Sequence, residues 1–260
     1  MYPDNQGTTP RLRIVDANCG VGPWGWRDPL MPSDPADTLA LMDQCGIAAA
    51  LVHSNLVHTP ASAADVNAAT LRAVAGCPRF IPAFVLAPHP YADKPQPADY
   101  AQAMQRAGVR AAWLRPGSQQ HGVWPWLLAE LLTMCTAHRL PLFLPADNVT
   151  PGDVHALCAD FPDLRLILTN LGYRADVWLY PLLRQHAELR VCLGQTYVPP
   201  LAPERFVRHF GAERMIFGSG LPHLAPGGLI GMVTYARLPE ADQARILAGN
   251  LEQLLQEVRW

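Results

Sequence analysis

Hydrophobic runs of strand length alternate along the chain with amphipathic segments of helix length. This alternation predicts parallel strands, each followed by a helix that covers one face of the sheet. The expected strands are Arg13–Ala17, Ala48–His53, Phe80–Leu86, Val109–Arg115, Pro141–Pro145, Arg165–Thr169, Arg190–Leu193 and Arg214–Gly218. The expected helices are Asp34–Cys45, Ala61–Ala75, Ala98–Ala107, Pro125–His138, Val154–Phe161, Val177–His186, Pro203–Phe210, Glu240–Leu247 and Leu251–Val258.

Residues at the predicted boundaries support these elements. Ser33 precedes Asp34-Pro35, which is typical of an N-cap followed by an acidic first turn. Gly46 and Gly108 follow predicted helices, where a left-handed C-cap favours glycine. Eight strands with interleaved helices predict one α/β domain, a (β/α)8 TIM barrel over residues 11–260, after a flexible tail at residues 1–10. A doubly wound open sheet is the alternative architecture.

Composition narrows the classes of partner. The chain has 260 residues, half of them hydrophobic, and a net charge of −2 without a long run of either sign. We therefore expect neither nucleic acid nor a membrane surface as a partner. No apolar stretch approaches the roughly 18 residues that span a bilayer, and the first ten residues lack an apolar signal core, so we expect a cytoplasmic protein. A small molecule is the expected partner, and a homo-oligomer is compatible with the sequence.

The six cysteines are scattered and form no Cys-x-x-Cys pair. Most lie beside apolar residues in predicted helices or strands, so we interpret them as reduced, buried thiols. Cys19 is the one alternative, because a nucleophilic cysteine needs a basic partner, and His53 ends the neighbouring strand. Strand alternation points Cys19 toward the helices and Asn18 toward the barrel mouth, which favours a packing role for Cys19.

Several stretches, in order and at barrel spacing, resemble the amidohydrolase superfamily from Arg13 to Leu255. The closer branch is the amidohydrolase-2 group, which includes the aminocarboxymuconate-semialdehyde decarboxylase and pyrone-dicarboxylate lactonase types. The stretches that carry the resemblance are Ile14–Gly20, Leu41–Ile47, Arg79–Phe84, Phe161–Leu171, Gly211–Pro222 and Gly249-Asn250.

The resemblance implies a divalent metal held by two histidines on the first strand, histidines on the fifth and sixth strands, and an aspartate on the eighth. In this chain those positions hold Asn18, Gly20, Pro145, Asn170 and Gly220. Glycine and proline offer no side-chain ligand, and amide oxygens bind zinc poorly beside imidazole. We therefore expect no metal and no other cofactor. The lactonase type uses the strand-eight aspartate as a base without metal, and Gly220 removes that route as well.

The site of such a barrel lies at the carboxyl ends of its strands. Asn18 and Asn170 are expected there and can hold a neutral carbonyl or amide, or simply fill space. Arg115 ends the fourth strand and suits a carboxylate, because its guanidinium binds two oxygens at once. The alternative for Arg115 is an ion pair with Asp147, the one carboxylate that the sequence places near the centre.

The remaining candidates lie in the loops after the strands. His223 is a candidate acid–base catalyst, or a loop histidine bonded to backbone. Trp24 and Trp26, in a loop that also carries Arg27, are expected to form an apolar lid or aromatic wall, or to pack on the barrel rim. Asn55 and His58 follow the second strand. Polar contacts to a ligand are also expected from His53 and from the Gln195-Thr196-Tyr197 segment.

Three functional hypotheses follow. The first is a metal-independent hydrolase or lyase for a small carboxylated or carbonyl-containing molecule, in which Arg115 anchors the carboxylate and His223 or Asp147 moves the proton. The second is an inactive amidohydrolase-like barrel that binds or regulates. The third is a metal enzyme whose ligands have moved to His53, His89 and His223, because three histidines suffice for zinc.

Overall fold

The computed structural model of the protein describes residues 12–24, 34–89, 95–194 and 196–260. Within these ranges, all the paired strands run parallel, in the order β1-β2-β3 and β4-β5-β6-β7-β8-β9. Their bounds are β1 Val15–Val21, β2 Ala49–Ser54, β3 Phe80–Pro82, β4 Phe84–Leu86, β5 Ala112–Leu114, β6 Leu142–Pro145, β7 Leu166–Thr169, β8 Arg190–Leu193 and β9 Met215–Phe217.

Backbone hydrogen bonds join the two ladders into a closed barrel. Only Ala83 separates β3 from β4, and its N–H donates to the carbonyl of Val52 at 2.9 Å, so β3 and β4 form one interrupted strand. On the other side, the N–H of Gly20 donates to the carbonyl of Leu221 at 2.7 Å, which ties β1 to the segment after β9. The described strands therefore occupy eight positions. The predicted (β/α)8 barrel is confirmed, and the open sheet is wrong.

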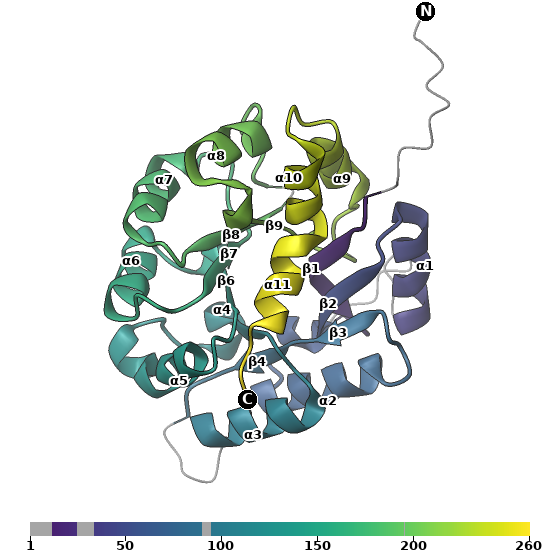
Figure 1. The fold of residues 1–260 in the computed structure, drawn as a ribbon. Coiled ribbons are helices and arrows are strands. Elements are labelled where there is room, and N and C mark those ends of the chain that lie inside the picture. The colour runs from purple at the N-terminus through teal and green to yellow at the C-terminus, as the bar shows by residue number, and fades with distance from the viewer. Residues whose placement is uncertain (1–11, 25–33, 90–94, 195) are drawn as a thin grey trace, which may run out of the picture.

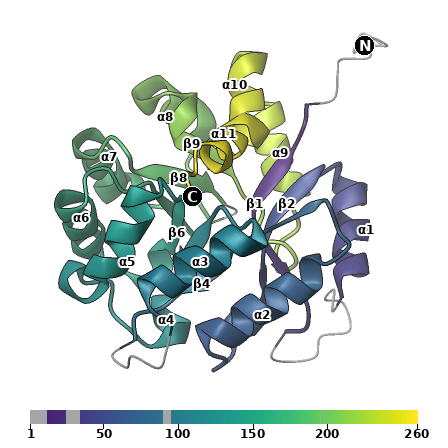
Figure 2. The same cartoon turned by 60° about the horizontal axis from the view of Figure 1, so that its bottom comes forward.

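Helices follow the strands around the outside of the barrel (Figures 1 and 2). Proline begins α1, α3, α5 and α6, where its missing N–H costs no helical hydrogen bond. None of the helices in the described ranges is both long and apolar enough to cross a membrane. The bounds are α1 Pro35–Cys45, α2 Ala63–Val74, α3 Pro97–Ala107, α4 Pro116–Gln119, α5 Pro125–Ala137, α6 Pro151–Asp160, α7 Asp176–Gln185, α8 Ala202–Phe210, α9 Gly227–Thr234, α10 Glu240–Ala244 and α11 Asn250–Gln256. Short turns of other helix types are η1 Asn55–His58, η2 Ala146–Asn148, η3 Ala212–Arg214 and the π-helical η4 Arg245–Gly249.

The hydrophobic core has two layers, one inside the barrel and one between strands and helices. Inside, Trp113 stacks on Phe143 with ring centroids 4.9 Å apart, and both side chains are fully buried. Their neighbours along the strands, Leu114 and Leu144, belong to the outer layer. This alternation is the two-residue period of a strand whose two faces are both covered. Each fully buried large side chain contributes about 1.5–3 kcal/mol to folding.

A register shift in β1 decides which of its side chains reach the barrel mouth. The pairing of β1 with β2 is irregular between Asp16 and Cys19. Ala17 belongs to the inner layer, whereas Cys19, two residues later, belongs to the outer layer. The shift therefore reverses the alternation and leaves Asn18 at the mouth, which is where the sequence placed it, with Cys19 pointing toward the helices.

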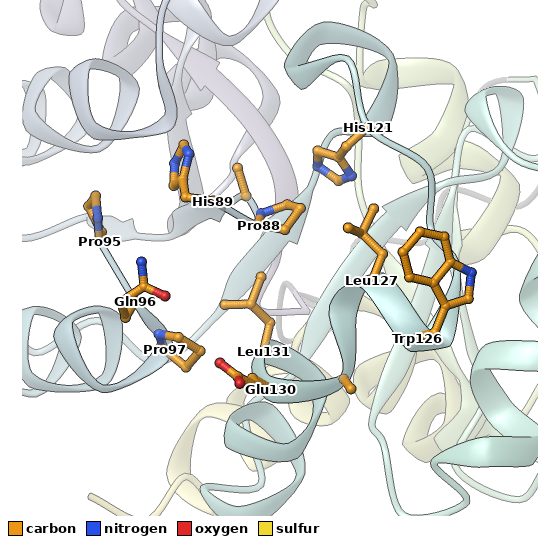
Figure 3. A pocket seen from close by; sticks show the side chains of 12 residues that line it. Pro88, His89, Pro95, Gln96, Pro97, His121, Trp126, Leu127, Glu130 and Leu131 are labelled. Carbon is orange, nitrogen blue, oxygen red and sulfur yellow. The ribbon is translucent and has the colours of Figure 1, made fainter. Parts of the chain in front are cut away.

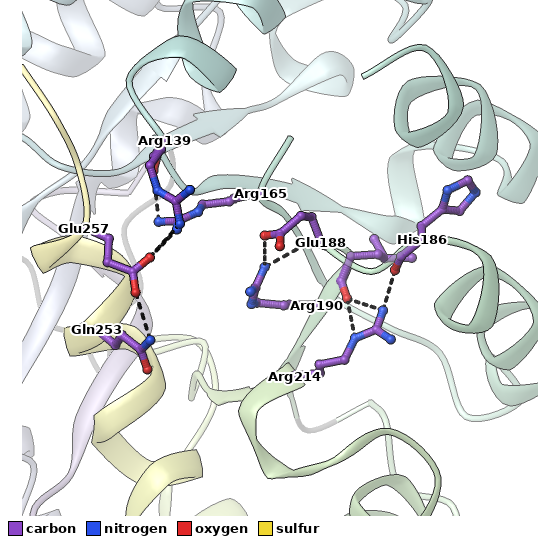
Figure 4. Close-up of polar contacts among 9 residues, drawn as sticks. Arg139, Arg165, His186, Glu188, Arg190, Arg214, Gln253 and Glu257 are labelled. Carbon is purple, nitrogen blue, oxygen red and sulfur yellow. Dashed lines mark hydrogen bonds and ion pairs between the residues drawn. The ribbon is translucent and has the colours of Figure 1, made fainter. Parts of the chain in front are cut away.

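The C-terminal helix closes the end of the barrel opposite the mouth. Leu251, Leu254 and Leu255 of α11 join the inner hydrophobic layer. Glu257, which follows α11, pairs with the buried Arg165 and accepts a hydrogen bond from Arg139 at 2.9 Å (Figure 4). Both arginines precede their strands, so this contact lies at the amino ends of β6 and β7. The opposite end of the barrel is left for a functional site.

The predicted boundaries differ from the observed ones where side chains cap helices. Asp34, not Ser33, caps α1 and accepts from the N–H of Asp37 at 2.9 Å, while Ser33 lies outside the described residues. α6 begins three residues earlier than predicted, because Thr150 and Asp153 form a capping box. α4 and the glycine-rich α9 were not predicted, since glycine is a weak helix former. Gly46 and Gly108 do adopt the predicted left-handed conformation, with φ of 69° and 67°.

Candidate functional site

Two adjoining cavities lie at the carboxyl ends of the strands. The larger is about 360 Å³ and the smaller about 140 Å³. They share four lining residues, which are Asn18, Asn170, Gly220 and Leu224. The larger cavity is also lined by Asp147, Gly172, Gly194, Thr196, Gly218 and Ser219, and the smaller by Gly20, His53, His58, Arg115, Leu221 and His223. The structure thus brings most of the sequence candidates to one place.

Arg115 is a buried cation without a counter-charge beside it. Its side chain is only 8% exposed, and its guanidinium lies over the ring of Trp113, 4.2 Å from the centroid. Within the described part of the chain, no carboxylate lies within 4.0 Å of it, so the ion pair with Asp147 is not formed. Burial lowers the pKa of Arg115 to about 10, while the charge of Asp147 raises it. The guanidinium therefore stays charged at neutral pH.

Arg115 fixes the state of His53. The Nη2 atom of Arg115 lies 2.5 Å from Nε2 of His53. Because a guanidinium only donates, Nε2 of His53 must accept, and the neutral ring carries its proton on Nδ1. Burial, and after it the charge of Arg115, lowers the pKa of His53 well below its ordinary value. His53 therefore orients Arg115 as a neutral acceptor.

His58 and His223 complete a group of three imidazoles around Arg115. Trp24 packs against both, with its ring centroid 4.0 Å from that of His58 and 3.6 Å from that of His223. The two histidine rings lie 5.7 Å apart. Desolvation first, and then the charge of Arg115, lowers the pKa of each. Both rings are therefore neutral at neutral pH and can accept a proton.

The other side of the mouth carries a negative charge. Asn170 adopts a left-handed backbone conformation with φ of 53°, and its Nδ2 atom lies 3.4 Å from both carboxylate oxygens of Asp147. Both side chains are exposed. The mouth thus has a cationic end at Arg115 and an anionic end at Asp147, with Asn18 and Asn170 between them.

Asp16 holds the two strand ends that flank the mouth. It accepts hydrogen bonds from the N–H of Asn18 at 2.9 Å, from the N–H of Ser219 at 2.8 Å, and from the Ser219 hydroxyl. The side chain is fully buried, and desolvation raises the pKa of Asp16 to about 6, although the three hydrogen bonds lower it. Asp16 therefore couples β1 to the segment after β9.

Some sequence candidates lie away from the mouth. Tyr197 is fully buried and its hydroxyl donates to Asp176 at 2.6 Å, so it does not line either cavity. Cys19 is fully buried in the outer layer, and desolvation raises the pKa of its thiol well above the ordinary value. This thiol is a packing group, so the proposed pairing of Cys19 with His53 is wrong. Trp26, Arg27 and Gln195 lie outside the described residues.

His89 lines a separate cavity of about 590 Å³ (Figure 3). This cavity lies between the segment after β4, the start of α3 and the first turns of α5. His121, Trp126 and Glu130 also line it. His89 is therefore not gathered with His53 and His223, and the proposed three-histidine metal site is wrong.

The residues at the expected metal-ligand positions do not fit a metal. The described ranges contain no group of three or more His, Cys, Asp or Glu side chains arranged to hold an ion. A Cβ atom on residue 20 would overlap Oδ1 of Asn55. Gly220 has φ of +79°, and a Cβ there would stand 3.0 Å from a methyl carbon of Leu224. Neighbouring side chains thus fill the space that two of the ligands would need.

Three residues that shape this site received no role from the sequence, although Asn55 and His58 were noted after the second strand. His58 ends the 3-10 turn that follows β2. Its side chain points into the mouth because of this type of turn, which the sequence did not reveal. Asn55, in the same turn, donates to the carbonyl of Gly22 at 2.7 Å and fills the space beside Gly20. Asp16 was visible as a charged residue inside a hydrophobic strand, which is a signal for a bonded, buried carboxylate.

The chain matches a known family and several solved barrels. The amidohydrolase family profile matches residues 10–256. No curated protein sequence matches.

Among solved structures of similar fold, 5-carboxyvanillate decarboxylase from Sphingomonas paucimobilis superposes with a TM-score of 0.71 at 16% identity, over 95% of this chain and 100% of that one. A 2-pyrone-4,6-dicarboxylic acid hydrolase described as putative, from Pseudomonas putida, has a TM-score of 0.69 at 18% identity, over 95% and 98%. A dihydroxybenzoic acid decarboxylase from Polaromonas, with bound manganese and 2-nitroresorcinol, has a TM-score of 0.71 at 15% identity, over 94% and 97%. At these identities the solved structures support the fold alone, whereas the profile spans nearly the whole chain, which therefore belongs to the amidohydrolase family.

Proposed function

We propose that the barrel mouth binds a small organic carboxylate through Arg115 and acts on it as a hydrolase or lyase without a metal. One observation carries this proposal: the guanidinium of Arg115 is buried, lines the smaller cavity and has no carboxylate within 4.0 Å in the described structure. A buried charge without a partner is costly, and an anionic ligand removes that cost. Solved barrels of similar fold include a 5-carboxyvanillate decarboxylase and a 2-pyrone-4,6-dicarboxylic acid hydrolase described as putative, both of which act on carboxylated molecules by name.

The side chains around Arg115 have the chemistry that such a reaction needs. Asn18 and Asn170 line both cavities, and their amide N–H groups can donate to a carbonyl oxygen as negative charge develops on it. His223 is neutral and accepts the proton of the attacking water or of the substrate. Asp147, at the other end of the mouth, is the alternative proton acceptor.

A binding barrel without turnover is the second candidate. In the described residues, neither His58 nor His223 has a carboxylate within 4.0 Å that would orient the ring and raise its basicity. Imidazoles with a lowered pKa are weak bases. This observation favours retained ligand binding over fast chemistry, and it leaves the role of Arg115 unchanged.

Calorimetric titration with benzoate, 4-methylbenzoate and the matching benzamides tests the proposal. We expect the carboxylates to bind and the neutral amides to bind at least tenfold more weakly. Arg115→Gln should weaken the binding of carboxylates by about 10- to 100-fold, because a hydrogen bond to a charged group is worth roughly 1.5–3 kcal/mol. Arg72→Gln, on the exposed face of α2, is the matched control and should bind normally.

Turnover is tested separately with lactone, ester and hydroxybenzoate substrates, with the metal content measured on the same sample. Hydrolysis or decarboxylation that survives a chelator and falls in His223→Asn supports the enzyme. Carboxylate binding without any turnover supports the binding barrel. Equal affinity of wild type and Arg115→Gln for benzoate would rule out the anchoring role.

A further inference from the structure

The two adjoining cavities of the mouth carry opposite charges. The smaller is lined by Arg115 and the larger by Asp147, and the shared residues Asn18, Asn170 and Leu224 lie between these ends. Arg115 and Asp147 are more than 4.0 Å apart, yet the charge of Asp147 acts on Arg115. The mouth is therefore an electrical dipole with room for a molecule between its two ends.

We propose that the ligand of this mouth is zwitterionic, with its carboxylate at Arg115 and an ammonium group at Asp147. This inference rests on the proposed carboxylate site and adds the second end of the ligand to it. A molecule with both charges satisfies both ends of the mouth, whereas a simple carboxylate leaves Asp147 without a cationic partner and meets its repulsion.

Asp147 has the capacity to receive such a group. Within the described residues, its carboxylate accepts side-chain hydrogen bonds from Nδ2 of Asn170, at 3.4 Å to each oxygen, which is long for a hydrogen bond to a carboxylate. No lysine, arginine or histidine in the described ranges lies within 4.0 Å of it. A carboxylate offers about four lone-pair positions, so several remain for an ammonium.

The walls between the two ends favour a flat, apolar spacer. Four glycines line the larger cavity and present only backbone, namely Gly172, Gly194, Gly218 and Gly220. Leu224 lines both cavities and contributes an apolar side chain to each. A ring or short alkyl chain between a carboxylate and an ammonium matches this combination of flat backbone and one aliphatic contact.

Three ligands of one shape test the proposal by calorimetry. They are 4-(aminomethyl)benzoate, 4-(hydroxymethyl)benzoate and 4-ethylbenzoate, which place an ammonium, a hydroxyl or a methyl group at the same position. We expect the ammonium ligand to bind about three- to tenfold more tightly than the methyl ligand at low salt. Because Asp147 is exposed, the preference should shrink as salt is added.

Substitutions identify the residue responsible. Asp147→Asn should erase the preference for the ammonium ligand, while 4-ethylbenzoate binds as well as before or better. Asp163→Asn, at an exposed aspartate before β7, is the matched control and should keep the preference. 3-(Aminomethyl)benzoate is tested alongside, because it places the ammonium group at a different distance from the carboxylate.

The outcomes separate this inference from the proposed function. Failure of all the carboxylates to bind would overturn both. Binding of all of them with equal affinity, or a preference for the ammonium that survives in Asp147→Asn, would overturn the zwitterion and leave the Arg115 site in place. A preference that disappears only in Asp147→Asn supports the inference.

Discussion

The Nη2 atom of Arg115 lies 2.5 Å from the Nε2 atom of His53, although 62 residues separate them in the chain. His53 lies one residue before the end of β2 and Arg115 follows β5, so the closed barrel itself brings the two together. The contact leaves the guanidinium charged, oriented and without a counter-ion within 4.0 Å in the described residues.

His53→Leu should reduce both stability and carboxylate affinity, because it removes the acceptor and leaves a buried donor of Arg115 unsatisfied. The expected loss in the free energy of unfolding is about 1–3 kcal/mol. His53→Gln offers an amide oxygen as a new acceptor and should recover part of both quantities. Urea unfolding and benzoate titration measure the two effects. Identical behaviour of the Leu and Gln variants would show that the hydrogen bond to Arg115 contributes nothing.

Carboxylate binding at Arg115 should be accompanied by proton uptake. His223 is the group concerned, because desolvation first and then the charge of Arg115 lower its pKa in the free protein. An anion bound at Arg115 offsets that charge, and within about 4–6 Å it raises the pKa of an imidazole by about 1–3 units. The bound-state pKa is then the higher one, so affinity should rise as pH falls from 8 toward 6, by at most tenfold for each unit of pKa change.

Titration in two buffers of different ionisation enthalpy measures this uptake. The apparent binding enthalpy should differ between phosphate and Tris at pH 6.5 and agree at pH 8.5. His223→Asn should reduce the difference, whereas His155→Asn, on the outer helix α6, should not. Buffer-independent heats at both pH values would contradict the prediction.

Asp16 should make the protein less stable as pH rises from about 4 to 6. Its pKa is raised from 3.8 to about 6 in the fold, so between these values the folded state binds more protons than the unfolded chain. Stability contributed by the protonated form is therefore lost as the carboxyl ionises, and the full penalty is roughly 3 kcal/mol at 1.36 kcal/mol per pKa unit. To isolate this effect, the free energy of unfolding is measured from pH 4 to 7 for the wild type and for Asp16→Asn, and the difference between the two proteins is followed with pH. A flat difference would contradict it.

The fold was predictable from the sequence, and the site only in part, for physical reasons. Strand and helix periods are local, so the eight strand positions followed from hydrophobic spacing alone. Arg115 and Asn170 could be placed because each directly follows a strand whose direction is fixed. His58 could not, because it reaches the mouth through a 3-10 turn. Tyr197 was misplaced, because only its long-range partner Asp176 draws the side chain away from the mouth. The register shift in β1 likewise depends on pairing with β2, which no local pattern encodes.

The space beside Gly20 provides the last prediction. Gly20→Ala should destabilise the fold by about 1–3 kcal/mol, because the new Cβ overlaps Oδ1 of Asn55. Asn55→Ala should also destabilise, since it removes the bond to the carbonyl of Gly22. The double variant should be at least about 1 kcal/mol more stable than the sum of the two effects, as expected for residues in contact.

Gly194→Ala is the matched control for this cycle, because Gly194 also lines the mouth but a Cβ added there would meet no atom within 4 Å beyond its chain neighbours. Its substitution should leave stability within about 0.5 kcal/mol and should not couple to Asn55. Additive effects of Gly20→Ala and Asn55→Ala would mean that Asn55 moves aside freely. In that case a histidine at residue 20 could also be accommodated. Strong coupling would mean instead that the mouth is shaped around Asn55 and that a metal ligand at this position requires Asn55 to be removed first.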